Sequence, residues 1–184
     1  MANLWMARLK GLWSEYHYNL AQKDQRSNVQ SSVLNPCTGK LITRISEGTP
    51  EDVNIAVKAA QHAFATTWGL KASGAVRGAL IHKLAQLIED NADAIAAIEA
   101  LDNGKTAHFA KAVDVASVLA CLRYFAGWAD KIQGKTIETS EESLAYTRHE
   151  PIGVVGQIIP WNYPGACPAR SLRCICHPRS INGH

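Results

Sequence analysis

The 184-residue chain lacks features that mark several classes of protein. It has no run of five or more like charges, and its formal net charge is only +3, so no nucleic-acid partner is expected. The longest uncharged stretch, residues 151–169, contains four prolines, which excludes a membrane-spanning helix there. Arg8, Lys10 and Glu15 interrupt the N-terminal apolar residues, so no secretory signal is expected.

The five cysteines are odd in number, and three of them lie after residue 166. Without a secretory signal, this pattern favours a reduced, cytoplasmic setting over a disulfide framework. A mitochondrial location stays open, because the first residues could form a weakly amphipathic targeting segment. Cys167, Cys174, Cys176 and His177 offer zinc-ligand chemistry, but a single residue between two ligands is too short a spacing, so no metal site is expected.

Residues 1–28 contain apolar side chains at spacings of three and four, namely Trp5, Leu9, Leu12, Trp13, Tyr16 and Leu20. This spacing predicts an amphipathic helix that covers apolar surface. Docking to a membrane or to a partner is the alternative interpretation of the same pattern. Further along, two apolar stretches at 29–34 and 41–46 flank a turn-forming segment at residues 35–39, which predicts a hairpin.

Helix signals dominate the next part of the chain. Thr49 followed by Pro50 and two acidic residues predicts the start of a helix. Three further apolar stripes predict helices beginning near residue 76, at residue 91 and near residue 107. Gly104 is expected to end the third helix in a left-handed conformation, and Gly134 to end the fourth after it has run to about residue 132.

Beyond residue 134 the hydrophobic period changes. Alternation at residues 144–148 predicts a half-exposed strand, and the apolar run at 152–159 predicts a strand buried on both faces. The loop 160–164 would then follow the carboxyl end of a strand, where parallel α/β sheets bind ligands. Asn162 in this loop could donate amide hydrogens to an oxyanion, or it could simply satisfy a proline-rich turn.

Five motifs, in this order, resemble the aldehyde dehydrogenase superfamily: Asn35-Pro36-Cys37-Thr38-Gly39, Leu101-Asp102-Asn103-Gly104-Lys105, Arg123 to Lys131, Gly134-Lys135-Thr136-Ile137, and Glu150 to Pro164. The resemblance implies an α/β fold in which an N-terminal helical layer leads into the first strands of an aldehyde-dehydrogenase-like fold that is incomplete here. It also implies four segments. These are a divergent segment 1–28, a helical layer with an oligomerisation-type strand at 29–149, the first strand and loop of a cofactor domain at 150–164, and an unrelated, disordered tail at 165–184.

For the site, the resemblance implies that Asn162 stabilises the oxyanion of a thiohemiacetal. Ile158, Ile159, Pro160 and Trp161, together with Asn162, match residues lining the nicotinamide-ribose end of the cofactor pocket. In this family a complete member oxidises an aldehyde to a carboxylic acid with NAD or NADP, using a catalytic cysteine and a general-base glutamate. The family's later Glu-Leu-Gly-Gly, Gly-Ser-Thr and Gly-Gln-x-Cys motifs are absent from the 184 residues.

These absences predict that the chain alone is inactive and binds no cofactor, because a nucleophile and a base cannot be replaced by binding alone. An aldehyde would be a substrate only of a complete enzyme. Two alternatives stay open: a non-catalytic assembly or regulatory fragment that binds full-length homologues, and a truncated product without function.

Overall fold

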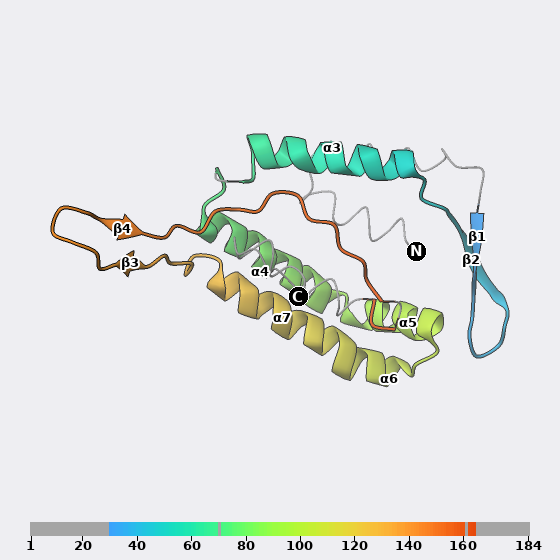
Figure 1. Cartoon of the computed structure of the whole chain (residues 1–184). Coiled ribbons are helices and arrows are strands. Elements are labelled where there is room, and N and C mark those ends of the chain that lie inside the picture. Colours follow the sequence, from blue (N-terminus) through green and yellow to red (C-terminus); the bar gives the residue numbers. More distant parts are fainter. Residues whose placement is uncertain (1–29, 70, 161, 165–184) are drawn as a thin grey trace. The chain divides into compact units, whose positions relative to one another are not determined.

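The computed structural model describes residues 30–69, 71–160 and 162–164 (Figure 1). The chain divides into two units, Met1–Ala60 and Gln61–His184, which are treated separately below. The helix predicted for residues 1–28, the tail predicted for 165–184 and the predicted cofactor-lining Trp161 lie outside the described residues. Within the described part, no helix combines the length and the apolar character needed to cross a membrane.

The first unit contains the predicted hairpin. Strand β1 (Gln30–Leu34) pairs antiparallel with β2 (Leu41–Ser46). The side-chain oxygen of Asn35 accepts hydrogen bonds from the backbone N–H groups of Cys37 (2.8 Å) and Thr38 (3.2 Å), which fixes the turn. Gly39 completes it with a φ of 68°, a conformation that glycine adopts without a steric penalty.

Helix α3 (Pro50–Thr66) begins where the sequence predicts. The Asp52 carboxylate accepts hydrogen bonds from the backbone N–H (2.8 Å) and the hydroxyl (2.7 Å) of Thr49, and the Asp52 N–H donates back to that hydroxyl (3.3 Å). Such reciprocal bonds satisfy donors that a helix start otherwise leaves unpaired.

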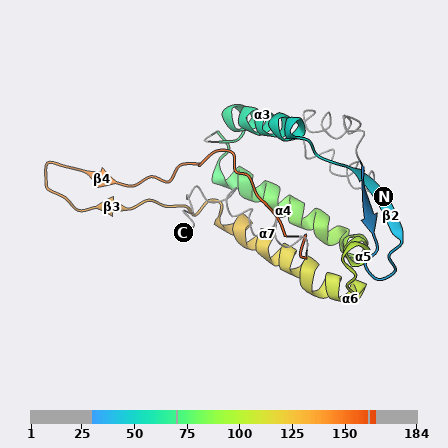
Figure 2. The same ribbon diagram turned by 45° about the vertical axis from the view of Figure 1, so that its right-hand side comes forward.

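Helices α4 (Gly74–Asp90) and α7 (Ala116–Trp128) form the centre of the second unit and run side by side in both ribbon views (Figures 1 and 2). Their shared core consists of Ile81 and Ala85 from α4, and Val118, Leu122 and Ala126 from α7. Leu122 is 1% exposed. The residues whose spacing predicted these helices belong to this core only in part: Leu84, Ile88 and Phe125 pack against it, whereas Val76, Leu80 and Trp128 are exposed.

A second small core joins α5 (Ala92–Asn103) to the segment that precedes α7. Its buried residues are Ala96, Ala110 and Val115. Gly104 ends α5 with a φ of 79°, which confirms the predicted left-handed cap. The hydroxyl of Thr106 then accepts a hydrogen bond from the Phe109 N–H (3.2 Å) and starts the next helix.

The helix predicted as one continuous element over residues 107–132 differs from that expectation. It consists of α6 (Ala107–Phe109), a π-helical segment η1 (Ala110–Val115) and α7, and it ends at Trp128 rather than near Gly134. At this end Lys131 satisfies two of the last helix carbonyls: its backbone N–H donates to the Trp128 carbonyl (3.0 Å) and its ammonium to the Gly127 carbonyl (2.7 Å).

The strand predictions beyond residue 134 are corrected by the structure. Strand β3 (Thr136–Ile137) pairs antiparallel with β4 (Ala145–Tyr146), so the strand predicted at 144–148 has only its second and third residues paired. The strand predicted at 152–159 is wrong: these residues form no strand, and Ile158 is 100% exposed. A strand needs a hydrogen-bonded neighbour, and none of the described strands pairs with this segment.

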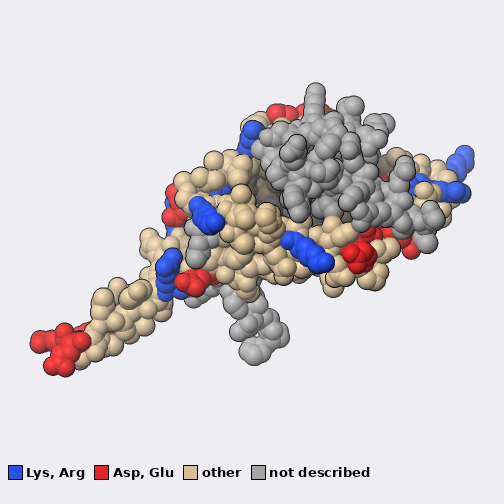
Figure 3. All heavy atoms as spheres, turned by 90° about the horizontal axis from the view of Figure 1, so that it is seen from above, with Lys and Arg blue, Asp and Glu red and all other residues tan. Residues whose placement is uncertain are grey.

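Charged side chains of both signs are interspersed over the helices on the face shown in Figure 3. At the end of the β3–β4 hairpin the visible charges are acidic, in keeping with Glu138, Glu141 and Glu142 in the connecting segment.

Candidate functional site

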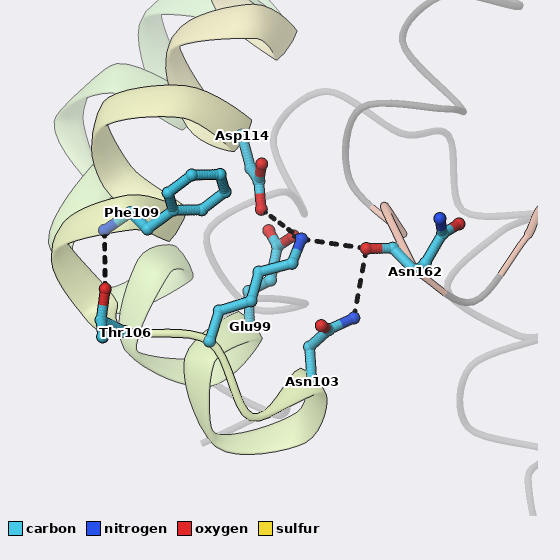
Figure 4. Close-up of polar contacts among 7 residues, drawn as sticks. Glu99, Asn103, Thr106, Phe109, Asp114 and Asn162 are labelled. Atoms are coloured by element: carbon cyan, nitrogen blue, oxygen red, sulfur yellow. Dashed lines mark hydrogen bonds and ion pairs between the residues drawn. The ribbon is translucent and has the colours of Figure 1, made fainter.

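The structure places the predicted catalytic residue Asn162 against the end of α5 and the connection to α6. Its backbone carbonyl oxygen accepts two hydrogen bonds, from the Lys105 ammonium (2.9 Å) and from the Asn103 side-chain amide (3.2 Å). Figure 4 shows the side chain of Asn162 extending away from these contacts. The loop is thus held through its backbone, and the amide is directed to the other side.

Lys105 also faces two carboxyl groups that come from different helical segments. Its ammonium nitrogen lies 2.7 Å from Asp114 Oδ2, on η1, and 3.6 Å from Glu99 Oε1, on α5. The side chain of Asp114 is 0% exposed, that of Glu99 is 6% exposed and that of Lys105 is 17% exposed. We refer to Glu99, Lys105 and Asp114 as the buried triad.

In the buried triad one positive charge faces two carboxyl groups, and this imbalance favours the protonated form of Glu99. Burial, followed by the hydrogen bond and negative charge of Asp114, raises the pKa of Glu99 from 4.5 to about 7, although Lys105 opposes the shift. Burial alone would lower the pKa of Lys105, but the two carboxyl groups outweigh it and raise the pKa. A proton on Glu99 therefore leaves the triad electrically neutral.

Tyr163, the next residue of the loop, adds a third contact. The Lys105 ammonium lies 3.9 Å from the centroid of the Tyr163 ring, a distance at which a cation and an aromatic face attract each other. Lys105 therefore contacts both the backbone of Asn162 and the side chain that follows it.

The other predicted site residues are not brought together in an enclosed pocket. Ile158 and Ile159 are exposed (100% and 40%), and Pro160 is exposed as well. A pocket of about 400 Å³ opens near the end of α7, where Trp128, Thr147 and His149 contribute to its lining. None of the predicted site residues lines that pocket.

The sequence interpretation missed the buried triad, although a signal was present. Glu99 lies four residues after Ile95, and Asp114 lies four residues after Ala110 and four before Val118, so both acids fall on apolar helix faces. Carboxylates are almost never fully buried without a partner. Acids at such positions therefore indicate a nearby cation, and Lys105 is that cation.

Comparison with known proteins identifies the family. A sequence model described as the aldehyde dehydrogenase family matches residues 22–175. An aldehyde dehydrogenase of Agaricus bisporus is 58% identical over 141 residues, which make up 77% of this chain and 28% of that protein. The human mitochondrial aldehyde dehydrogenase is 51% identical over 133 residues, or 71% of this chain and 26% of that protein.

Solved structures agree with this assignment. The NAD⁺ complex of an aldehyde dehydrogenase from Bacillus cereus superimposes with a TM-score of 0.77 at 41% identity, covering 80% of this chain and 30% of that one. The chain belongs to the aldehyde dehydrogenase family, and its helical layer and short strands have the fold of that family. It spans less than a third of the length of these relatives.

Proposed function

We propose that these residues form the N-terminal part of an NAD(P)-dependent enzyme that oxidises an aldehyde to a carboxylic acid. In this proposal Asn162 is the oxyanion-stabilising residue. The observation that supports it most is the anchoring of the Asn162 carbonyl by Lys105 and Asn103, with the Asn162 side chain directed away from them (Figure 4). A fixed backbone with an outward-facing amide suits a hydrogen-bond donor that must already be in position when the negative charge develops on the substrate oxygen.

In the reaction, a cysteine thiolate of the complete enzyme adds to the aldehyde carbonyl, and the carbonyl oxygen becomes an oxyanion. The Asn162 amide donates a hydrogen bond to that oxygen and lowers the energy of the tetrahedral state. A bound NAD(P) supplies the hydride acceptor. Ile158, Ile159 and Pro160 fit one apolar wall of its site because their side chains are exposed and uncharged, and Trp161 is proposed for the same wall.

The 184-residue chain by itself is proposed to be inactive and to bind no cofactor. The sequence contains none of the family motifs for the nucleophile, the base or the phosphate loop, and a single extended segment cannot enclose a dinucleotide. The test incubates the purified chain with an aldehyde and NAD⁺ or NADP⁺ and follows absorbance of the reduced cofactor. We expect no signal above background. Turnover proportional to the chain and lost in Asn162→Ala would overturn this proposal.

A second candidate role is non-catalytic binding to homologous full-length subunits. The observation that favours it is the exposure of apolar side chains along residues 152–159, which pair with no described strand. Co-purification with a full-length homologue would support this role, and its loss on replacing Ile152 and Ile158 with Lys would locate the contact. Unchanged co-purification of that double variant would count against the role of this segment.

For the compartment we propose the cytoplasm, with mitochondria as the alternative. Fractionation of a mammalian or fungal cell culture that expresses the tagged protein distinguishes the two compartments. Recovery with the mitochondrial fraction would overturn the cytoplasmic proposal.

A further inference from the structure

We propose that Lys105 is a positioning residue for Asn162. It fixes the backbone carbonyl of Asn162, with Asn103 as the second donor, and thereby restricts the orientation of the Asn162 side chain. This inference rests on the proposed catalytic role of Asn162. It adds a residue that touches no substrate and that acts from the helical layer, 57 positions earlier in the sequence.

The geometry of the carbonyl supports the first step. A carbonyl oxygen has two lone pairs, and here each has a donor, the Lys105 ammonium at 2.9 Å and the Asn103 amide at 3.2 Å. Two donors arriving from one side restrict rotation of the peptide plane between Asn162 and Tyr163. Since the same α-carbon carries the Asn162 side chain, this restriction also limits where the amide can point.

The second step concerns Lys105 itself, because a flexible lysine would fix nothing. Its ammonium donates hydrogen bonds to Asp114 Oδ2 at 2.7 Å and to the Asn162 carbonyl at 2.9 Å, and it lies 3.6 Å from Glu99 Oε1 in an ion pair without a hydrogen bond. Asp114 and Glu99 are both buried on packed helical segments. The cation is therefore held by rigid elements, and it transmits their position to the loop.

The third step concerns how precisely the Asn162 amide must be placed to stabilise an oxyanion. A donor to an oxyanion must lie about 2.7–3.1 Å from the oxygen, and sites work when their groups are held to about 0.5 Å. An exposed loop carrying Asn162 would not meet this requirement through its own contacts. The charge-assisted bond from Lys105, stronger than a neutral hydrogen bond, provides the missing constraint.

The sequence permits a direct measurement. Asn162-Tyr163 is the only place where asparagine is followed by tyrosine. Labelling the 184-residue chain with carbonyl-¹³C asparagine and ¹⁵N tyrosine therefore gives one correlation peak, which reports the Asn162 carbonyl. The peak is recorded in solution, or by solid-state spectroscopy on sedimented protein where the chain forms large oligomers.

The comparison uses Lys105→Met and a matched control, Lys111→Met, which removes a lysine paired with the exposed Asp93 at 2.6 Å. We expect Lys105→Met to move the Asn162 carbonyl resonance upfield and to broaden it, because a hydrogen-bond donor is lost and the loop samples more conformations. Lys111→Met should leave the resonance unchanged. An unchanged peak in Lys105→Met would overturn the inference.

Lys105→Met also leaves Asp114 buried without its cation, so a change could come from loss of folding. The double variant Lys105→Met/Asp114→Asn removes both charges and keeps the shapes. With helical circular dichroism equal to wild type, an upfield, broadened peak in this variant supports the positioning role, and a wild-type peak overturns it. The result is independent of catalysis: full turnover of an Asn162→Ala enzyme would refute the proposed function while leaving the measured contact in place.

Discussion

The raised pKa of Glu99 predicts that the helical layer becomes less stable as the pH rises from 5 to 8. In the folded chain the pKa is about 7, against 4.5 for an ordinary glutamate, so the folded state holds a proton that the unfolded state has released. The stabilisation is complete below pH 4.5 and is lost as the pH rises through about 7. At about 1.4 kcal/mol per pH unit, this pKa difference corresponds to at most about 4 kcal/mol.

Burial and the groups facing Glu99 together determine this sign, and burial is the largest cause. Asp114 on η1 repels a second negative charge, while Lys105 attracts it, and burial disfavours the ionised form most of all. Replacing Glu99 with glutamine mimics the protonated carboxyl at every pH. The variant should therefore match wild type near pH 5 and be more stable than wild type near pH 8.

Hydrogen exchange of the α5 amides, measured by mass spectrometry from pH 5 to pH 8 and corrected for intrinsic exchange, gives the free energy of local opening. Taking the difference between wild type and Glu99→Gln cancels titrations of other groups. Glu89→Gln is the matched control, because Glu89 is exposed and pairs with Arg123 at 2.6 Å. Parallel pH profiles for wild type and Glu99→Gln would refute the argument, as would a wild-type stability that rises towards pH 8 relative to the variant.

Lys105, Asn162 and the exposed apolar side chains can each be tested by a separate measurement. Lys105→Met should lower the free energy of local opening of the helical layer by about 3–5 kcal/mol by leaving Asp114 unpaired, whereas Lys111→Met should cost at most about 1 kcal/mol. Hydrogen exchange of the α5 amides compares the two variants. In a complete family member, the variant matching Asn162→Ala should lower kcat by about 10²–10³ with little change in KM, and full turnover would limit Asn162 to shaping the turn. The 184-residue chain alone should be helical but loosely packed and prone to aggregate, because large apolar side chains such as Ile158 are exposed; a monodisperse monomer with a sharp melt, by size exclusion and circular dichroism, would contradict this.

The elements that the sequence predicted well are those whose signals are local. The Thr49 cap, the turn at Asn35 and the left-handed Gly104 each depend on contacts within a few residues, and each was found where expected. The family resemblance was likewise carried by short motifs and was confirmed. The run at 152–159 failed as a strand because apolar composition cannot supply the neighbouring strand that a sheet requires.

The candidate site was predictable only in part. The position of Asn162 in a loop followed from the motif, but the contacts that hold the loop come from residues more than fifty positions away. The spacing of Glu99 and Asp114 from their apolar neighbours was a signal that the sequence interpretation did not use, and spacing could not have shown that both acids would meet one lysine. The apolar spacing continues through residues 110–115, so a continuous helix was expected where the π-helical segment carries Asp114.

The meeting of Lys105 and Asn162 connects two of the motifs that carry the family resemblance. Asn103 and Lys105 belong to the motif at 101–105, and Asn162 belongs to the motif at 150–164. The first motif ends a helix with Gly104 and so turns the chain just before Lys105, which brings the ammonium to the buried carboxylates. The helical layer would then position a residue for the reaction without taking part in the chemistry. The positive charge of Lys105 is paired with Asp114, and the further hydrogen bond of its ammonium holds the backbone of Asn162, the residue proposed to stabilise the oxyanion.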